Sequence, residues 1–215
     1  MPDSLLSGLA QQFGGDTIGQ LAGLIGGDQD QTGRAVAAAL PMLLGSMTGA
    51  AQDSGGANAL FGALTKDHDG SILDMLGPML AGGYASRALG SDGGRILGHI
   101  LGNKQPAVEQ TVAKSAGIPA GLVQKLLPIL APIVMGYLGR RMSSGGLDAG
   151  GLGSILGGER EQVKKQDPGL GGIFDILGGG SKNDDDDDGG LMDLAGDLLG
   201  SSAGKAILGQ ILGRK

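Results

Sequence analysis

The chain has 215 residues, of which 40% are hydrophobic, and this is enough for the packed core of one or two domains. The absence of Cys excludes disulfides, thiolate zinc sites and iron–sulfur clusters, while two Tyr and three Phe offer almost no surface for stacking nucleic-acid bases. A formal net charge of −6 at pH 7 repels phosphate backbones, so nucleic acid is not an expected partner.

The composition changes near residue 142. The chain contains 46 glycines and 8 prolines, and most of its negative charge lies after residue 142, where Asp184–Asp188 forms a run of five acids. Like charges at this density repel one another, which is typical of a solvated spacer. We therefore expect a helical domain over residues 1–142 and a Gly/Asp-rich, flexible and partly disordered tail over residues 143–215.

Every readable segment of the first part is typical of a helix, because no segment shows the two-residue alternation of a half-buried strand. Candidate N-caps are Thr17, Asp30 or Thr32, Ser54, and Ser91 or Asp92. Ser71 followed by Asp74 resembles a capping box, Pro106 suits a first helical position, and Gly117 suits a helix end. The patterns predict an all-α fold of seven to nine short helices, including 18–25, 35–47, 57–64, 72–80, 96–101, 106–116 and 119–142.

The predicted helix over 119–142 is the most hydrophobic part of the chain. Its 13 apolar residues between Lys125 and Arg140 are fewer than the roughly 20 that a membrane span needs. A helix that is apolar on all sides must be buried in the domain centre or in an oligomer interface. We expect Leu126, Leu130, Ile133 and Tyr137 to form an interaction surface on it.

Prolines lie inside this same helix. Pro128 and Pro132 would free the carbonyls of Gln124 and Pro128. A kink around neighbouring helices is the favoured interpretation, and a small apolar ligand near the freed carbonyls is the alternative.

Two internal repeats are present. In the first, Leu24-Ile25-Gly26 leads to Leu40-Pro41, and Ile100-Leu101-Gly102 leads to Leu127-Pro128 after a spacing eleven residues longer. This pattern predicts a duplicated multi-helical bundle, with the extra helix as an insertion in the second copy.

The second repeat joins residues 94–104 to the last twelve residues of the sequence. Both copies read Ile-Leu-Gly-x-Ile-Leu-Gly-x-Lys, but the second copy has no Leu-Pro helix after it. So short a helix is not stable alone. We therefore predict that residues 204–215, here called the terminal segment, dock on the helical domain in cis or in trans, through Ile207, Leu208, Ile211 and Leu212.

One stretch resembles a calcium loop. Asp67-His68-Asp69-Gly70 matches the Asp-x-Asp-Gly core, but the twelfth loop position is Leu76, so the bidentate acid is missing. A helix cap is favoured over a metal site at Asp67 and Asp69, and no other cofactor is expected. The two histidines, His68 and His99, stand in no metal-binding spacing.

The set of Ala35–Pro41, Asp67–Leu73, Ile96–Gly102 and Leu127–Met135 resembles the YidB-like bacterial domain of unknown function (domain of unknown function 937) over about residues 18–141. The resemblance implies a small multi-helical bacterial domain. It implies no activity and no catalytic residues, and it does not extend to the long tail.

The sequence contains no Gly-Lys-Ser/Thr phosphate loop and no Ser/His/Asp set with a plausible geometry, so an enzyme is not expected. We expect a non-catalytic interaction or self-association module. Met1-Pro2-Asp3-Ser4 does not resemble a secretory n-region, so the expected compartment is the cytoplasm. A calcium-responsive protein, a membrane-surface protein and a binder of small apolar ligands remain alternatives.

Overall fold

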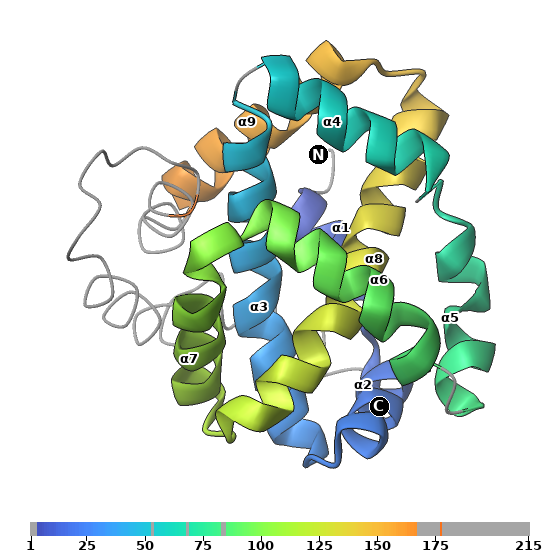
Figure 1. Ribbon diagram of the computed structural model, residues 1–215, viewed down its shortest axis with the longest axis vertical. Helices are drawn as coiled ribbons and strands as arrows, with labels where there is room; N and C mark the ends of the chain where they lie inside the picture. The colour runs from blue at the N-terminus through green and yellow to red at the C-terminus, as the bar shows by residue number, and fades with distance from the viewer. Residues whose placement is uncertain (1–3, 53, 68, 83–84, 167–176, 178–215) are drawn as a thin grey trace.

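The computed structural model describes residues 4–52, 54–67, 69–82, 85–166 and 177, and all regular elements within these residues are helices. The expected all-α fold is therefore confirmed (Figure 1). The elements are α1 (Leu5–Gln12), α2 (Gly15–Ile25), α3 (Gln29–Ala50), α4 (Ser54–Lys66), α5 (Ser71–Ala81), α6 (Ala85–Ile100), a 3₁₀ turn (Gly102–Lys104), α7 (Gln105–Ala116), α8 (Ala120–Gly145) and α9 (Ala149–Gln166).

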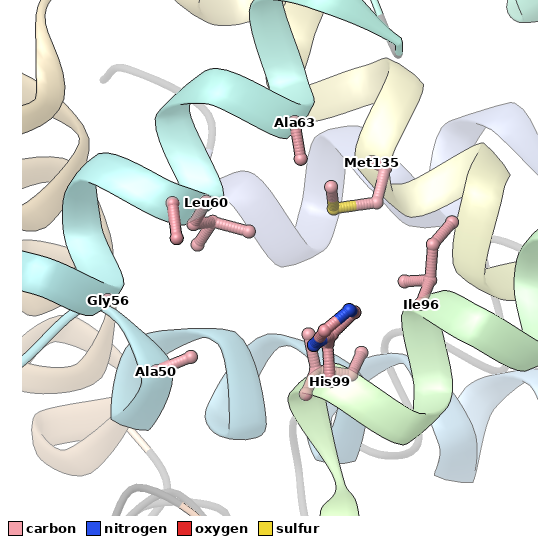
Figure 2. Close-up of a pocket in the computed structure, with 9 residues that line it drawn as sticks. Ala50, Gly56, Leu60, Ala63, Ile96, His99 and Met135 are labelled. Carbon is pink, nitrogen blue, oxygen red and sulfur yellow. The ribbon is translucent and has the colours of Figure 1, made fainter.

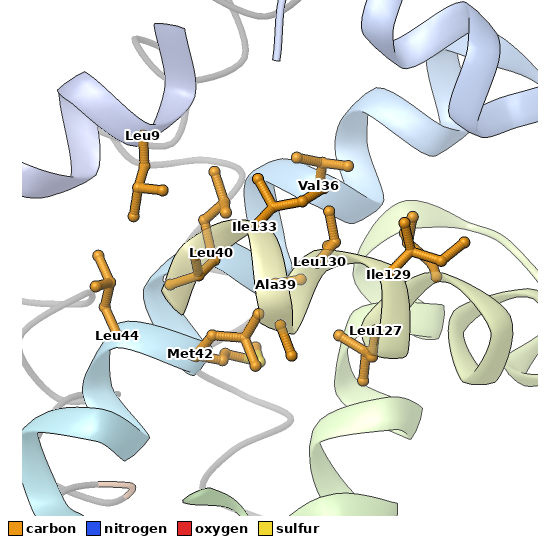
Figure 3. Packing of buried hydrophobic residues seen from close by; sticks show 14 of the residues in the cluster. Leu9, Val36, Ala39, Leu40, Met42, Leu44, Leu127, Ile129, Leu130 and Ile133 are labelled. Atoms are coloured by element: carbon orange, nitrogen blue, oxygen red, sulfur yellow. The ribbon is translucent and has the colours of Figure 1, made fainter. Parts of the chain in front are cut away.

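Helices α3 and α8 form the centre of the molecule. They contact each other and are surrounded by the other helices (Figure 1). Leu40 of α3 and Leu130 and Ile133 of α8 have no exposed surface, and Figure 3 shows them packed together. The run Ala35–Ala39 offers only small side chains, which lets neighbouring backbones come close.

The duplication is visible as two equivalent helix pairs, α2–α3 and α7–α8. The first helix of each pair ends at a glycine with positive φ, Gly26 (79°) and Gly117 (69°), which lie 91 residues apart. With the same offset, Pro41 of α3 is equivalent to Pro132 of α8. The equivalent of Gly26 is thus Gly117 and not Gly102, so the second copy needs no inserted helix.

Hydrogen bonds between the two pairs repeat as well. Arg34 Nε of α3 donates to the Ala116 carbonyl at the end of α7, at 3.3 Å. Lys125 Nζ of α8 donates to the Ile25 carbonyl at the end of α2, at 3.4 Å. Arg34 and Lys125 are also 91 residues apart, and each places a cation at the negative end of a helix of the other pair.

The packed helical body extends beyond residue 142, the boundary expected from composition. Helix α8 continues to Gly145, and α9 packs on α3 and α4 with Leu152, Leu156 and Val163 buried. The carboxylate of Glu159 accepts hydrogen bonds from the backbone N–H groups of Leu5 (2.8 Å) and Leu6 (3.0 Å). Residues 149–166 therefore belong to the body, since a buried acid of α9 binds the first turn of α1.

Helix α6 crosses α8 at very close range. The backbone of Gly93 lies so near the carbonyl of Pro128 that a side chain on residue 93 would overlap it. The Pro128 carbonyl lacks its helical hydrogen bond, because the residue four positions later is Pro132, which has no N–H to donate. The space at that carbonyl is filled by the α6 backbone, so it is not available for the small ligand considered as an alternative.

Several helix ends differ from the predicted ones. The cap of α3 is Asp28, whose Oδ1 accepts from the N–H of Gln31 at 3.1 Å, and not Asp30 or Thr32. Helix α6 begins at Ala85, so Ser91 and Asp92 lie inside it. The predicted cap of α3 is two to four residues from the observed one, because adjacent polar residues offer the same chemistry, whereas the start of α6 lies six residues before Ser91.

Candidate binding groove

An apolar groove lies between α4 and α6, with the end of α3 at one side and α8 as its floor. Figure 2 shows Leu60 and Ala63 facing Ile96 and His99 across an open space, with Met135 of α8 behind them. The cavity has a volume of about 270 Å³. The groove is lined by Ala50, Gly56, Ala59, Leu60, Ala63, Ile96, His99, Ile100 and Met135.

The groove stays open because α4 presents small residues to it. Gly56, Ala59 and Ala63 recur at helical spacing along one face of α4. On the opposite side Ile96 and Ile100 are one turn apart on α6. Because these side chains are small, they leave space between α4 and α6, and that space is lined mainly by apolar groups.

His99 is the ionisable residue in this lining, and the other eight lining residues carry no charge. Its ring nitrogens point toward the cavity, and the residue is exposed. A lone imidazole among aliphatic side chains does not assemble a nucleophile with a base. The groove is therefore suited to binding apolar groups, with one polar contact available at the rim.

A second, shallower cavity of about 240 Å³ continues from the groove along the ends of α3 and α6. It shares Ala50, His99 and Ile100 with the groove, so the two form one continuous surface. Leu177, which lies beyond α9, lines this cavity and is 5% exposed. The remaining lining residues are Ser46, Gly49, Leu101, Gly102 and Lys104.

The interaction residues predicted on α8 occupy different places from the groove. Leu126, Leu130 and Ile133 have no exposed surface and belong to the core, so they cannot contact a partner while the body is folded. Tyr137 is half-buried, and its hydroxyl lies against Gly8 of α1. Ile207, Leu208, Ile211 and Leu212 lie outside the described residues. The groove was not predicted from the sequence, although the helical spacing of the small residues of α4 indicates a face that could leave space beside it.

The calcium-like loop leads directly into α5, whose N-cap residue is Gly70 with a positive φ of 98° and no side-chain cap. Asp69 Oδ1 accepts from the N–H of Ser71 at 3.0 Å, and this hydrogen bond lowers the pKa of Asp69 below its usual 3.8. The predicted capping box between Ser71 and Asp74 is absent, since Asp74 instead pairs with Arg140 at 2.7 Å. Arg140 also donates to the Gly70 carbonyl at 2.8 Å, so the positive charge of its guanidinium group lies beside this loop.

Asp67 and Asp69 are both exposed, and His68 lies outside the described residues. Among the residues that the structure describes, no three His, Asp or Glu side chains come together as a set of metal ligands.

A polar hollow of about 540 Å³ lies on the other side of the 3₁₀ turn. There the buried carboxylate of Glu109 accepts hydrogen bonds from the side-chain amides of Gln105 (2.8 Å) and Gln124 (3.0 Å). Both carboxylate oxygens thus have an intramolecular donor, which accounts for the burial of this acid as part of the α7–α8 contact.

Helix α8 is the one helix, among the residues described, that is long and apolar enough to cross a membrane by length and composition. In this fold 67% of its most hydrophobic 18-residue window is buried within the molecule. A central core helix has the same properties, which matches its position between α3, α6 and α7.

Comparison with known proteins gives one match. The model of the family described as "Bacterial protein of unknown function (DUF937)" matches residues 7–141, which is more than half of the chain. No curated protein and no solved structure matches the chain. The matched range covers the groove residues of α3, α4, α6 and α8 and ends before α9.

Proposed function

We propose that this chain, which belongs to the DUF937 family of bacterial proteins of unknown function, is a non-catalytic interaction module whose groove binds a short apolar helical segment. The occupant that we propose is the terminal segment, residues 204–215. The observation that carries the proposal is the open apolar groove beside Ile96 and Ile100, because the terminal segment repeats the sequence of that part of α6.

The chemistry of the two surfaces is complementary. The terminal segment presents Ile207, Leu208, Ile211 and Leu212 with helical spacing, and the groove offers aliphatic walls of matching size. A glycine follows each apolar pair in the segment, Gly209 and Gly213, and these residues without side chains let its backbone approach the small face of α4 closely.

The expected affinity in trans is modest. Burial of each of the four apolar side chains contributes about 1.5–3 kcal/mol, while association costs at least about 4 kcal/mol. The difference of at most about 2–8 kcal/mol corresponds to dissociation constants from tens of millimolar down to about micromolar at the tightest. Self-association of this kind would be concentration-dependent, as expected of a module in a bacterial cytoplasm that exchanges partners.

The proposal is tested in the full-length protein by placing a charge in the terminal segment. Leu208→Asp removes an apolar contact, whereas Gln210→Asp adds the same charge to the same segment on a polar position. We expect Leu208→Asp to increase amide hydrogen exchange in residues 96–101 or to lower the molar mass measured by light scattering. Gln210→Asp should change neither quantity.

Light scattering distinguishes docking in trans from docking in cis. A lower mass in the Leu208→Asp variant indicates docking in trans, and faster exchange at an unchanged monomer mass indicates docking in cis. The same exchange and the same mass in the wild type and in both variants would show that the terminal segment does not bind the body, which would contradict the proposal.

A further inference from the structure

We infer that the chain binds its own tail at a second site, next to the groove, and that Leu177 is the anchor. Leu177 is 5% exposed and lines the shallow cavity at the ends of α3 and α6 together with Ala50, His99 and Ile100. A leucine beyond the last packed helix gains burial only if it contacts the body, and burial of such a side chain contributes about 1.5–3 kcal/mol.

The sequence around Leu177 suits an anchor. In Ile173-Phe174-Asp175-Ile176-Leu177, apolar residues stand three and four positions before Leu177, and glycines flank the whole unit. The cavity is formed by small residues of α3 (Ser46, Gly49 and Ala50) and by the aliphatic residues Ile100 and Leu101 at the end of α6, with His99, Gly102 and Lys104 completing its lining. This lining offers apolar contacts to a leucine side chain such as that of Leu177.

Chain length favours docking in cis. Only the residues from Gln166, the end of α9, to Leu177 separate the body from the anchor, and α9 packs on α3, which borders the cavity. A link of about ten residues spans roughly 33–36 Å when extended. A link of this length, starting from a helix that packs on α3, is compatible with docking on the same molecule, without a second copy of the chain.

Anchoring of Leu177 keeps the terminal segment close to the groove of the same chain, and this step rests on the proposed function. Ile207 lies 30 residues after Leu177, and the intervening Gly- and Asp-rich sequence is typical of a flexible spacer. Such a spacer has a root-mean-square length of about 30 Å, and tethering of this kind gives effective concentrations in the millimolar range. At micromolar protein concentration the terminal segment therefore meets the groove of its own chain first and acts as an autoinhibitory plug.

The anchor is tested by paramagnetic relaxation enhancement in the full-length protein. The chain has no cysteine, so Ser181→Cys places a single nitroxide label four residues after Leu177. We expect the label to broaden the amide signals of residues 46–50 and 99–104. Leu177→Asp should abolish the broadening, and the matched variant Leu191→Asp, a tail leucine beyond the label, should retain it.

Two further measurements make the result decisive. In the first, chains that carry the nitroxide but no ¹⁵N are mixed with ¹⁵N-labelled chains that carry no nitroxide. Docking in cis predicts no broadening of the ¹⁵N signals in this mixture, and broadening in the mixture would overturn docking in cis. Absence of broadening in the parent protein, or broadening that survives Leu177→Asp, would also overturn the anchor. The variant Leu208→Asp should leave the signals of residues 99–104 broadened, so failure of the terminal segment to bind is distinguishable from failure of the anchor.

Discussion

The smallest features of the molecule decide how closely its central helices pack. At Gly93 the backbone of α6 touches the carbonyl of Pro128 in α8, and only a residue without a side chain fits there. A glycine inside a helix normally costs up to about 1 kcal/mol relative to alanine, so its presence needs a reason. The close approach of α6 to the carbonyl freed by Pro132 is that reason.

Gly93→Ala should therefore destabilise the protein. The added methyl group overlaps the Pro128 carbonyl, and overpacking of this kind costs about 1–3 kcal/mol. Gly94→Ala is the matched control, because an added Cβ there meets nothing within 4 Å. Urea denaturation followed by circular dichroism measures both, and the control should be neutral or stabilising by up to about 1 kcal/mol. Equal stability of the two variants would contradict the close contact.

Asp69 predicts a dependence of stability on pH. Its pKa is lowered in the folded state by the hydrogen bond from the Ser71 N–H, so the ionised form stabilises the fold. This contribution is fully present above the unfolded pKa and is lost as the pH falls through the lower folded pKa.

Asp69→Asn tests this dependence, because the amide oxygen can still accept from Ser71 but does not titrate. The difference in urea midpoint between the wild type and Asp69→Asn should shrink as the pH falls from about 6 to about 3. A difference that does not change with pH would show that Asp69 does not stabilise the start of α5 through its charge.

At the scale of elements, the contacts most distant in sequence were the hardest to predict. Helix α1 is eight residues long, too short for a stable isolated helix, and the Gly-rich sequence of α9 resembles the tail that follows it. Both pack on α3, and Glu159 joins them because its carboxylate accepts from the N–H groups of Leu5 and Leu6. No local pattern in the sequence encodes a contact over 150 residues.

Glu159→Gln should release α1 from α9. The substitution removes the charge and one acceptor, and an N–H group left without a partner in a buried place costs about 1–3 kcal/mol. The expected result is faster amide exchange in residues 5–12 and a lower denaturation midpoint. Glu161→Gln is the control, since Glu161 is exposed on the same helix, and a similar effect of both variants would contradict a specific role for Glu159.

The helices with strong local signals were predicted with the correct type and approximate range. Residues 106–116 and 119–142 correspond to α7 and α8, because a proline at the start, a glycine at the end and an apolar face agree there. The repeat was detected, but its register was wrong, because α8 contains two prolines and the one that follows a leucine, Pro128, is not the equivalent of Pro41. Only the positive φ of Gly26 and Gly117 and the hydrogen bonds of Arg34 and Lys125 identify the equivalent residues.

At the scale of the whole molecule, the two halves of the duplication differ in how α1 and the end of α6 are covered. With the 91-residue offset, Leu5 and Leu9 of α1 are equivalent to Ile96 and Ile100 of α6. On the α1 side Glu159 closes the contact to α9, and Leu5 and Leu9 are buried. On the α6 side the groove separates Ile96 and Ile100 from α4. The sequence predicted the copy of this α6 segment at the end of the chain but not the open surface, which depends on the packing of four helices.

Binding of an isolated peptide tests the central claim most directly. A fluorescent peptide of residues 204–215 is titrated with the full-length Leu208→Asp protein, whose own segment is disabled, and fluorescence anisotropy is measured. We predict saturable binding, which Ala63→Glu in the groove abolishes and Asn58→Glu on the exposed face of the same helix retains. Binding that is absent, or that Ala63→Glu leaves unchanged, would contradict the account of this groove as a docking site.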